Sequence, residues 1–412
     1  MTRQEKHGWL IVASLFVTML LIVGSGYNAT PVFVPALLKT FGWSRAKVSL
    51  LPSVAALTWG VLVFPVGWLL DRVEARFVML AGALSAGLGF ILASRADSFA
   101  PMFIAYMLLG AAIAAGTIAP AAFIVANWFG ARRGVAMGVT LGGTTTGGML
   151  MTLAGSYLIA HWGWRTAYLV FAAPVFLIVI PSILLLVRSR PPGERVMTVA
   201  EAAETLEGLE TSVALRTRSL WMIVLGQGLW GFATTGAVIY LIQYLIDQGY
   251  SVAMAAGLMS LIFGLSTVGK VTMGLVADRV TARATATFVL TMNGVGVLLL
   301  LGVQHVWMLL PLMLTFGYLQ AAPLMLFPLL TAESMGLKRY GTLFGIVSGA
   351  NTFGAVFGPP VAGSIFDTTH SYVVAYSLFG ACYFVAAIAA YIARPYAAEV
   401  SLQTPAPSRV SA

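Results

Sequence analysis

Apolar runs of about twenty residues recur along almost the whole chain, and they limit the folds open to it. The hydrocarbon core of a bilayer is about 30 Å thick, so a helix needs about 20 apolar residues to cross it. Charged residues make up only 9% of the 412 residues, against about 25% in soluble domains. No extended alternation of polar and apolar residues suggests a membrane barrel. The sequence therefore predicts an all-α membrane protein that crosses the bilayer many times.

The apolar runs predict twelve transmembrane helices, six on each side of a polar stretch. The expected ranges are 8–38, 46–70, 76–94, 99–127, 132–160, 165–187, 219–246, 252–277, 283–303, 306–332, 340–366 and 372–393. We expect one six-helix bundle over residues 1–190, a cytoplasmic linker over 191–218, and a second bundle with a short tail over 219–412. Four glutamates spaced by three residues predict a short solvated helix in the linker.

The formal net charge is +9, and the positive residues fall mostly in the short loops of one predicted side. The opposite side holds only Lys39, Arg45, Lys47, Arg95 and Arg165. Such an asymmetry is a topology signal, because cytoplasmic loops are enriched in lysine and arginine. We therefore expect a multi-pass protein of the cell membrane, in bacteria the inner membrane. Both termini are predicted to be cytoplasmic, and no nucleic acid is expected as a partner.

A loop motif occurs twice, at an offset of 207 residues (274 − 67). The first copy contains Gly67, Asp71, Arg72 and Arg76, and the second contains Gly274, Asp278, Arg279 and Arg283. The same offset relates four glycines of the fifth range to four of the eleventh. Two repeated halves with a site between them are what a transporter needs in order to rock about its substrate. The motif residues are predicted to be gate contacts that join the two halves in one conformation.

These loops resemble the signature of the major facilitator superfamily. The resemblance covers essentially the whole chain and implies two six-helix bundles related by a pseudo-two-fold axis. A narrower resemblance is to the monocarboxylate transporters and the oxalate/formate antiporters. It rests on three stretches, which are Gly26–Ser49, Trp128–Gly138 and Gly163–Ala167.

Lys270 is the only lysine or arginine placed well inside an apolar run, Val252–Ala277. An ionisable group at that depth is costly and marks a functional site by default. The alternative is that the lysine reaches back to the cytoplasmic surface. It lies eight residues before Asp278, or about 12 Å along a helix, and a long side chain can recover part of that distance.

The family resemblance bears on the same site. Lys270 falls where monocarboxylate transporters have an arginine that binds the carboxylate. Ser266 replaces an aspartate, Asn28 a lysine and Gln320 an aromatic residue of that branch. The resemblance thus implies that one basic residue of the site is kept, which favours a monoanion over a dianion.

Further polar side chains within the predicted helices are candidates for substrate binding. They are Tyr27, Asn28, Gln227, Tyr318 and Gln320. Sparse polar contacts of this kind orient ligands in mostly apolar pockets. Polar side chains also bridge packed membrane helices, and the sequence leaves both readings open for each residue.

The function that these features predict is secondary active transport of a small organic anion, in the first place a monocarboxylate. Transport would proceed by alternating access, with proton symport or anion exchange. If Lys270 is protonated only when it holds an anion, the loaded and empty carriers carry equal charge. The expected partners are the anion, a proton or counter-anion and the lipid bilayer, and we expect a monomer.

Two other functions remain as alternatives. An efflux carrier for apolar or cationic compounds would be expected to carry a buried acid, which the predicted helices lack. A membrane receptor with a carrier fold would usually carry an added cytoplasmic domain. Enzyme motifs such as His-Glu-x-x-His and Gly-x-Ser-x-Gly are absent, so we expect no enzyme. The single cysteine, Cys382, excludes a cysteine metal cluster, and we expect neither a metal nor a cofactor.

Overall fold

The computed structural model describes residues 3–70, 72–129, 133–189, 208–336 and 338–394. Helices account for nearly all of these residues, and each of the twelve predicted ranges is largely helical. Helix is the expected result, because a chain in lipid must pair its backbone polar groups within each segment. The β-structure within the described ranges is one isolated antiparallel bridge, between Gly208 and Gly336.

The first half contains several interrupted helices. Its elements are α1 (Arg3–Thr18), η1 (Met19–Asn28), α2 (Thr30–Phe41), α3 (Arg45–Leu70), α4 (Ala75–Arg95), α5 (Phe99–Gly116), α6 (Ile118–Trp128), α7 (Arg133–Pro174), η2 (Val175–Val179) and α8 (Ile180–Leu186). The π-helical segment η1 joins α1 to α2 within the first predicted range. Gly163 interrupts α7 with φ 79° and ψ 163°, a backbone conformation that suits glycine. The fifth and sixth predicted ranges meet at this bend.

The second half follows the same order. Its elements are α10 (Thr211–Ala214), α11 (Arg218–Ile239), α12 (Leu241–Asp247), α13 (Val252–Arg279), α14 (Ala282–Leu299), η3 (Leu300–Gly302), η4 (Val306–Met308), α15 (Leu309–Leu312), η5 (Met313–Gly317), α16 (Pro323–Met335), α17 (Tyr340–Thr369) and α18 (Val373–Ile392). The predicted range 306–332 is the most broken, because short segments and a turn precede α16. Pro323 begins α16, at a position where the missing N–H of proline costs little.

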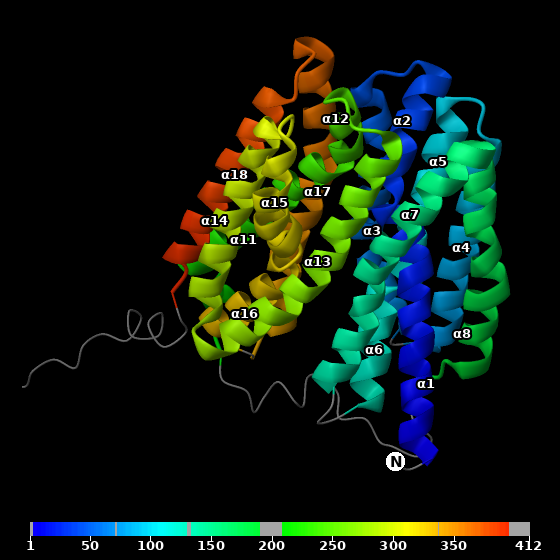
Figure 1. Cartoon of the computed structure of the whole chain (residues 1–412). Helices are drawn as coiled ribbons and strands as arrows, with labels where there is room; N and C mark the ends of the chain where they lie inside the picture. The colour runs from blue at the N-terminus through cyan, green and yellow to red at the C-terminus, as the bar shows by residue number, and fades with distance from the viewer. Residues whose placement is uncertain (1–2, 71, 130–132, 190–207, 337, 395–412) are drawn as a thin grey trace, which may run out of the picture.

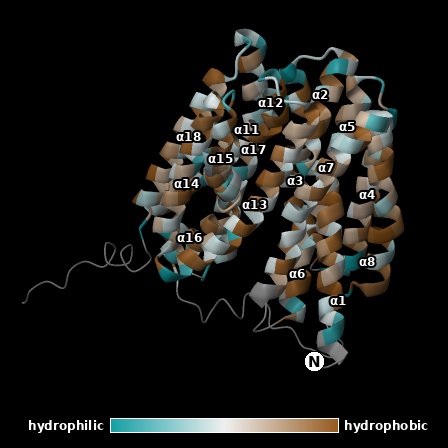
Figure 2. Cartoon of the chain, in the orientation of Figure 1, coloured by the Kyte–Doolittle hydropathy of each residue, from teal (hydrophilic) through white to brown (hydrophobic). Residues whose placement is uncertain are grey.

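Nine helical stretches of the described residues are long and apolar enough to cross a membrane. One of them, Ala136–Leu186, is 51 residues long and contains the bend at Gly163. Figure 2 shows hydrophobic residues along the middle of the helices and hydrophilic residues gathered toward their ends. The protein is therefore a helical, multi-pass membrane protein, while the number of twelve crossings stays a prediction.

Buried apolar residues form two clusters. One runs from Ile11 to Val187 and the other mainly from Leu209 to Ala393. The second cluster also includes three residues of the first half, Val32, Val34 and Val48. The two halves thus share apolar packing where α2 and α3 lie. The predicted boundaries at residues 190 and 219 stay a prediction, since residues 190–207 lie outside the described ranges.

The two ends of the molecule differ in how the halves meet (Figure 1). We call the end where α1 begins and α8 and α18 finish the linker end, and the opposite end the far end. At the far end, a Cβ added to Gly363 of α17 would lie 2.7 Å from the Ala46 nitrogen of α3. Near the linker end, Gly67, Gly138 and Gly345 have no described neighbour within 4 Å of such a Cβ. Backbones of the two halves therefore meet directly at the far end, where α17 lies against α3.

Glu210 connects the start of the second half to a loop at the linker end through salt bridges. Glu210 precedes α10 and pairs with Lys338 at 2.9 Å and Arg339 at 3.0 Å. Hydrogen bonds from these two cations lower the pKa of the Glu210 carboxyl. The other three glutamates of the predicted linker helix, Glu201, Glu204 and Glu207, lie outside the described residues.

Candidate functional site

Lys270 lies on α13, a 28-residue helix that crosses from the far end to the linker end. Ser251 caps the helix by accepting a hydrogen bond from the Met254 N–H at 3.2 Å. The Lys270 ammonium lies 3.5 Å from the hydroxyl oxygen of Thr145, on α7 of the other half. None of the salt bridges among the described residues includes Lys270, so its ammonium has no carboxylate partner there. The cation is therefore held between the two halves with a neutral neighbour.

The direction of the Lys270 side chain bears on whether it reaches the surface. Helical side chains lean toward the N-terminus of their helix, which for α13 is the far end. Thr145 lies twelve residues into α7, or about 18 Å from the start of that helix at 1.5 Å per residue. That depth is near the middle of a hydrocarbon core about 30 Å thick. The ammonium thus points along the seam between the halves, away from the linker end.

The seam between α7 and α13 is closely packed on the far side of Lys270. The Ser260 hydroxyl donates a hydrogen bond to the Met149 carbonyl at 2.7 Å. A Cβ added to Gly148 would lie 2.9 Å from the Phe263 ring and 3.0 Å from the Asn28 amide nitrogen. Small residues permit such close approach of membrane helices. A short stretch of α7 therefore contacts Asn28, Phe263 and Lys270 together.

Tyr27 and Asn28 finish the π-helical segment η1, a kind of distortion that is frequent at functional sites. The Asn28 amide donates a hydrogen bond to the Thr144 carbonyl at 2.8 Å. A Cβ added to Gly24 would lie 2.7 Å from the backbone of Gly147, so η1 lies directly against α7. This packing fixes the end of η1, and with it Tyr27, beside the seam.

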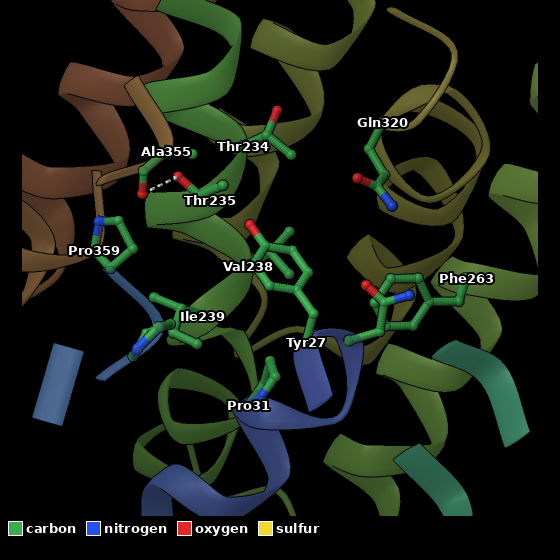
Figure 3. A pocket seen from close by; sticks show the side chains of 12 residues that line it. Tyr27, Pro31, Thr234, Thr235, Val238, Ile239, Phe263, Gln320, Ala355 and Pro359 are labelled. Carbon is green, nitrogen blue, oxygen red and sulfur yellow. Dashed lines mark hydrogen bonds between the residues drawn. The ribbon is translucent and has the colours of Figure 1, made fainter. Parts of the chain in front are cut away.

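A cavity of about 560 Å³, its open mouth included, lies between the halves. It is lined by Tyr27, Asn28, Pro31, Pro52, Thr234, Thr235, Val238, Ile239, Phe263, Gln320, Ala355 and Pro359. The lining residues come from both halves, and none of them is charged. Figure 3 shows Tyr27 lying across the cavity and Gln320 directed into it. The cavity is therefore a mostly apolar chamber with a few hydrogen-bonding groups.

Two polar side chains of the cavity make no hydrogen bond to another described residue. They are the Tyr27 hydroxyl and the Gln320 side-chain amide. The hydroxyls of Thr234 and Thr235, in contrast, are engaged with Tyr383 and with backbone carbonyls. The structure thus brings three of the predicted binding residues, Tyr27, Asn28 and Gln320, to one cavity.

Tyr318 and Gln227 do not line this cavity. The Tyr318 hydroxyl lies 2.6 Å from the Thr272 hydroxyl of α13, which makes it a contact between helices. Gln227 lies on α11 with only 3% of its surface exposed. Its side-chain oxygen has no hydrogen-bond partner among the described residues. The part played by each predicted residue in binding stays a prediction.

The predicted gate residues lie at the linker end, and those described stay within their own halves. Arg76 pairs with Glu74 at 2.6 Å, and the Arg72 guanidinium lies 3.9 Å from the Trp68 ring centre. Arg283 lies 4.8 Å from the ring centre of Tyr391. Asp71 is outside the described residues. Among the described residues, no contact joins Gly67 or Gly274 to the other half, and no salt bridge joins Asp278 or Arg279 to it.

The far end carries a polar seal that the sequence reasoning missed. Arg45, at the start of α3, pairs with Asp247 of α12 at 2.7 Å. Asp367 of α17 accepts hydrogen bonds from the Arg45 N–H at 3.0 Å and the Ala46 N–H at 2.9 Å. A carboxylate at a helix N-terminus is favoured by the unpaired N–H groups and the helix dipole there.

Aromatic residues complete this seal. The Tyr240 hydroxyl donates to the Arg45 carbonyl, and the Arg45 guanidinium contacts Tyr372. The guanidinium also lies 3.5 Å from the ring centre of Phe366. We call Arg45, Tyr240, Asp247, Phe366, Asp367 and Tyr372 the far-end seal. The sequence offered one sign of it, because Asp247 and Asp367 are rare acids at helix ends of a basic chain.

Known proteins are similar to this chain in sequence and in fold. A model of the Major Facilitator Superfamily matches residues 15–271 and 256–409. Monocarboxylate transporter 12 of Mus musculus is 25% identical over 402 residues, which cover 90% of this chain and 82% of that protein. Monocarboxylate transporter 13 of Rattus norvegicus is 26% identical over 380 residues, which cover 91% and 86%.

Solved structures match at the level of the fold. A bacterial homologue of the human lysosomal transporter Spinster, in an inward-facing and unoccupied conformation, has a TM-score of 0.71 at 19% identity. The alignment covers 98% of this chain and 100% of that chain. Its inward-facing, occupied form has a TM-score of 0.70 at 17% identity. With a family match over nearly its full length, this chain belongs to the Major Facilitator Superfamily of transporters and resembles its monocarboxylate transporters.

Proposed function

We propose that this transporter carries a small organic anion, in the first place a monocarboxylate, with Lys270 as the group that binds the carboxylate. The observation that carries the proposal is the unpaired ammonium of Lys270 between the two halves. A charge taken out of water is costly unless it is paired. An arriving carboxylate supplies the missing partner and gains a charge-assisted hydrogen bond.

Placement between the halves connects binding to movement. Lys270 belongs to the second half, and its neighbour Thr145 belongs to the first. An anion held there contacts both halves, so its affinity depends on how they are arranged. A ligand shifts a conformational equilibrium only through such a difference in affinity. This supports alternating access around the seam, with the present arrangement open toward the linker end, which the charge asymmetry predicts to be cytoplasmic.

The gate motifs fit the opposite step of the cycle. In this arrangement the described arginines of both motifs contact groups of their own half. We propose that the motif residues meet across the halves when the linker end closes. The far-end seal would then open, since the two ends alternate in a rocking transporter.

Proton symport and anion exchange differ in what the empty carrier does. In symport, Lys270 gives up its proton when the anion leaves, and the neutral site reorients. In exchange, Lys270 stays charged, and the empty site cannot reorient until another anion binds. A pH gradient should drive accumulation of the anion in the first case. The second case requires an anion on the opposite side of the membrane.

Efflux of apolar compounds is a second candidate, because the cavity is mostly apolar and uncharged. Cationic compounds are disfavoured, since the described cavity offers no acid and Lys270 repels them. The two candidates differ in their dependence on Lys270. Transport of a neutral compound should survive loss of the ammonium, whereas anion transport should not.

Uptake of labelled lactate, pyruvate, acetate and formate into proteoliposomes tests the proposal, with and without a pH gradient. We expect Lys270→Ala to lower anion uptake at least ten-fold and Lys270→Arg to restore part of it. Lys39→Ala is the matched control, because Lys39 is exposed near the far end and forms no salt bridge with a described residue. Undiminished uptake in Lys270→Ala would reject Lys270 as the anion site.

A further inference from the structure

Helix α18 packs between α11 and α14 in the second half. Figure 1 shows α14 and α18 on the side of this half that lies away from the first half. A Cβ added to Gly226 of α11 would lie 3.4 Å from the Ala386 carbonyl oxygen of α18. At the linker end, the Arg394 N–H donates a hydrogen bond to the Ser219 hydroxyl of α11 at 2.8 Å. The linker ends of these helices therefore lie together on one outer surface.

Three arginines lie on this surface. Arg218 begins α11 and Arg394 follows the end of α18, and both are exposed. The Arg283 guanidinium, in the first turn of α14, lies 4.8 Å from the ring centre of Tyr391 in the last turn of α18. None of the three arginines forms a salt bridge with a described residue. Like charges gathered in this way repel each other, so an anion that binds here is favoured.

The first half lacks this arrangement at the matching positions. The repeat offset of 207 residues relates Arg283 to Arg76, which pairs with Glu74 at 2.6 Å. The second half has Thr281 at the position of Glu74, so Arg283 has no such partner. The counterparts of Arg218, Tyr391 and Arg394 are apolar, namely Ile11, Leu184 and Val187. The preference for positive residues on one side of a membrane acts on both halves alike, so it does not account for this difference.

Aromatic residues place the arginines at the level of the lipid headgroups. Tyr391 is 61% exposed, and Trp221, three residues after Arg218, is 50% exposed. The Trp221 indole N–H donates a hydrogen bond to the Leu215 carbonyl at 2.8 Å, close to the start of α11. Tryptophan and tyrosine gather at the interface between membrane and water, where their rings lie among the headgroups. A charged headgroup can therefore reach the arginines from the membrane.

An apolar stripe runs from Tyr391 along α18 toward the middle of the membrane. Its members are exposed and three or four residues apart, and they are Leu378, Ala381, Val385, Ile388 and Tyr391. The ten residues from Ala381 to Tyr391 span about 15 Å at 1.5 Å per residue. This is half of a hydrocarbon core about 30 Å thick. One acyl chain of a single leaflet can therefore lie along the stripe while its headgroup contacts the arginines.

We propose that the linker ends of α11, α14 and α18 bind an anionic phospholipid, with its phosphate on Arg218, Arg283 and Arg394 and an acyl chain along α18. Arginine offers paired N–H groups to phosphate oxygens, and basic sites between membrane helices bind anionic headgroups. Glu333 lies at the same surface, where it accepts a backbone hydrogen bond at the start of α14, and three arginines outweigh its charge. The site is independent of the transported substrate.

Native mass spectrometry of the purified full chain tests this inference by lipid titration. The probes are dioleoyl phosphatidylglycerol, dioleoyl phosphatidylcholine and inorganic phosphate. We expect phosphatidylglycerol to bind at least ten-fold more tightly than phosphatidylcholine. It should also raise the apparent melting temperature, since a ligand of the folded state stabilises it. Inorganic phosphate at the same concentration should not displace it, because phosphate lacks the acyl chain.

Variants with equal charge changes locate the site. An arginine near anionic lipid contributes about five-fold in affinity, so Arg218→Gln with Arg394→Gln should weaken phosphatidylglycerol binding roughly 25-fold. Lys6→Gln with Arg188→Gln is the matched control, because both are exposed at the linker end of the first half. This pair should weaken binding less than two-fold. Arg218→Lys with Arg394→Lys keeps both charges and should recover most of the affinity.

Three outcomes would overturn the inference. Equal losses in the two glutamine pairs would mean that the lipid responds to the basic end as a whole, without a site at α18. Equal affinities for phosphatidylglycerol and phosphatidylcholine would show that the arginines do not select a charged headgroup. Displacement by inorganic phosphate at the same concentration would replace the lipid with a free anion and reject the acyl-chain contact.

Discussion

The Asp367→Asn substitution isolates the contribution of one carboxylate to closure of the far end. Asp367 accepts two backbone hydrogen bonds from the first turn of α3, at 3.0 Å and 2.9 Å. These bonds cross between the halves, so they exist only while the far end is closed. An asparagine keeps one acceptor oxygen and turns an N–H group toward the second backbone donor.

The size of the effect follows from these contacts. A hydrogen bond to a charged group contributes about 1.5–3 kcal/mol, and a neutral one about 0.5–1.5 kcal/mol. Loss of one bond and weakening of the other, reduced for partial solvent exposure, gives about 2–3 kcal/mol. Since 1.4 kcal/mol is a factor of ten in an equilibrium constant, the closed-to-open ratio should fall roughly 30- to 150-fold.

Pulsed electron spin resonance measures this shift directly. Spin labels at Ala160→Cys and Gln304→Cys, exposed positions on the two halves near the far end, report the distance across it in a Cys382→Ser background. Asp367→Asn should add a population with a longer distance. Asp97→Asn removes a far-end acid that accepts a hydrogen bond from its neighbour Ser98, and it should leave the distances unchanged. Identical distance distributions in the two variants would refute the reasoning.

Two further predictions use pairs of glycines on one helix. Gly147→Ala should lower the apparent melting temperature, because its Cβ would meet the Leu20 backbone, whereas Gly138→Ala in the same helix should not. A thermal unfolding scan of both variants decides this, and equal melting temperatures would contradict it. Gly363→Ala should open the far end in the spin-label assay, because its Cβ would lie 2.7 Å from the Ala46 nitrogen. Gly349→Ala has no described neighbour within 4 Å and is its control.

Much of the fold could be predicted because apolar runs of bilayer length have few other structures open to them. The predicted range 252–277 corresponds to α13, which spans Val252–Arg279. Lys270 could be identified because it is the one cation well inside such an apolar run. The breaks within helices were harder to foresee. The π-helical segment η1 packs against α7 where Gly24 meets Gly147, a contact between residues more than a hundred positions apart.

The candidate site was predictable in its residue types but not in its shape. Tyr27, Gln320 and Tyr318 look alike in the sequence, as polar residues within apolar ranges. Which of them faces a cavity depends on the rotation of each helix, which packing between helices sets. Tyr318 faces Thr272, whereas Tyr27 faces the cavity. The far-end seal depends on the same kind of information, because Arg45 and Asp367 are 322 positions apart.

The short stretch of α7 that contacts Asn28, Phe263 and Lys270 couples anion binding to movement of the two halves. An anion that draws the ammonium away from Thr145 removes a contact that spans the two halves. Exchange of the ligand and sliding of α7 along α13 would then occur together. Rigid inhibitors that fill the chamber while leaving this lysine undisturbed should therefore lock the protein, even though they carry no charge.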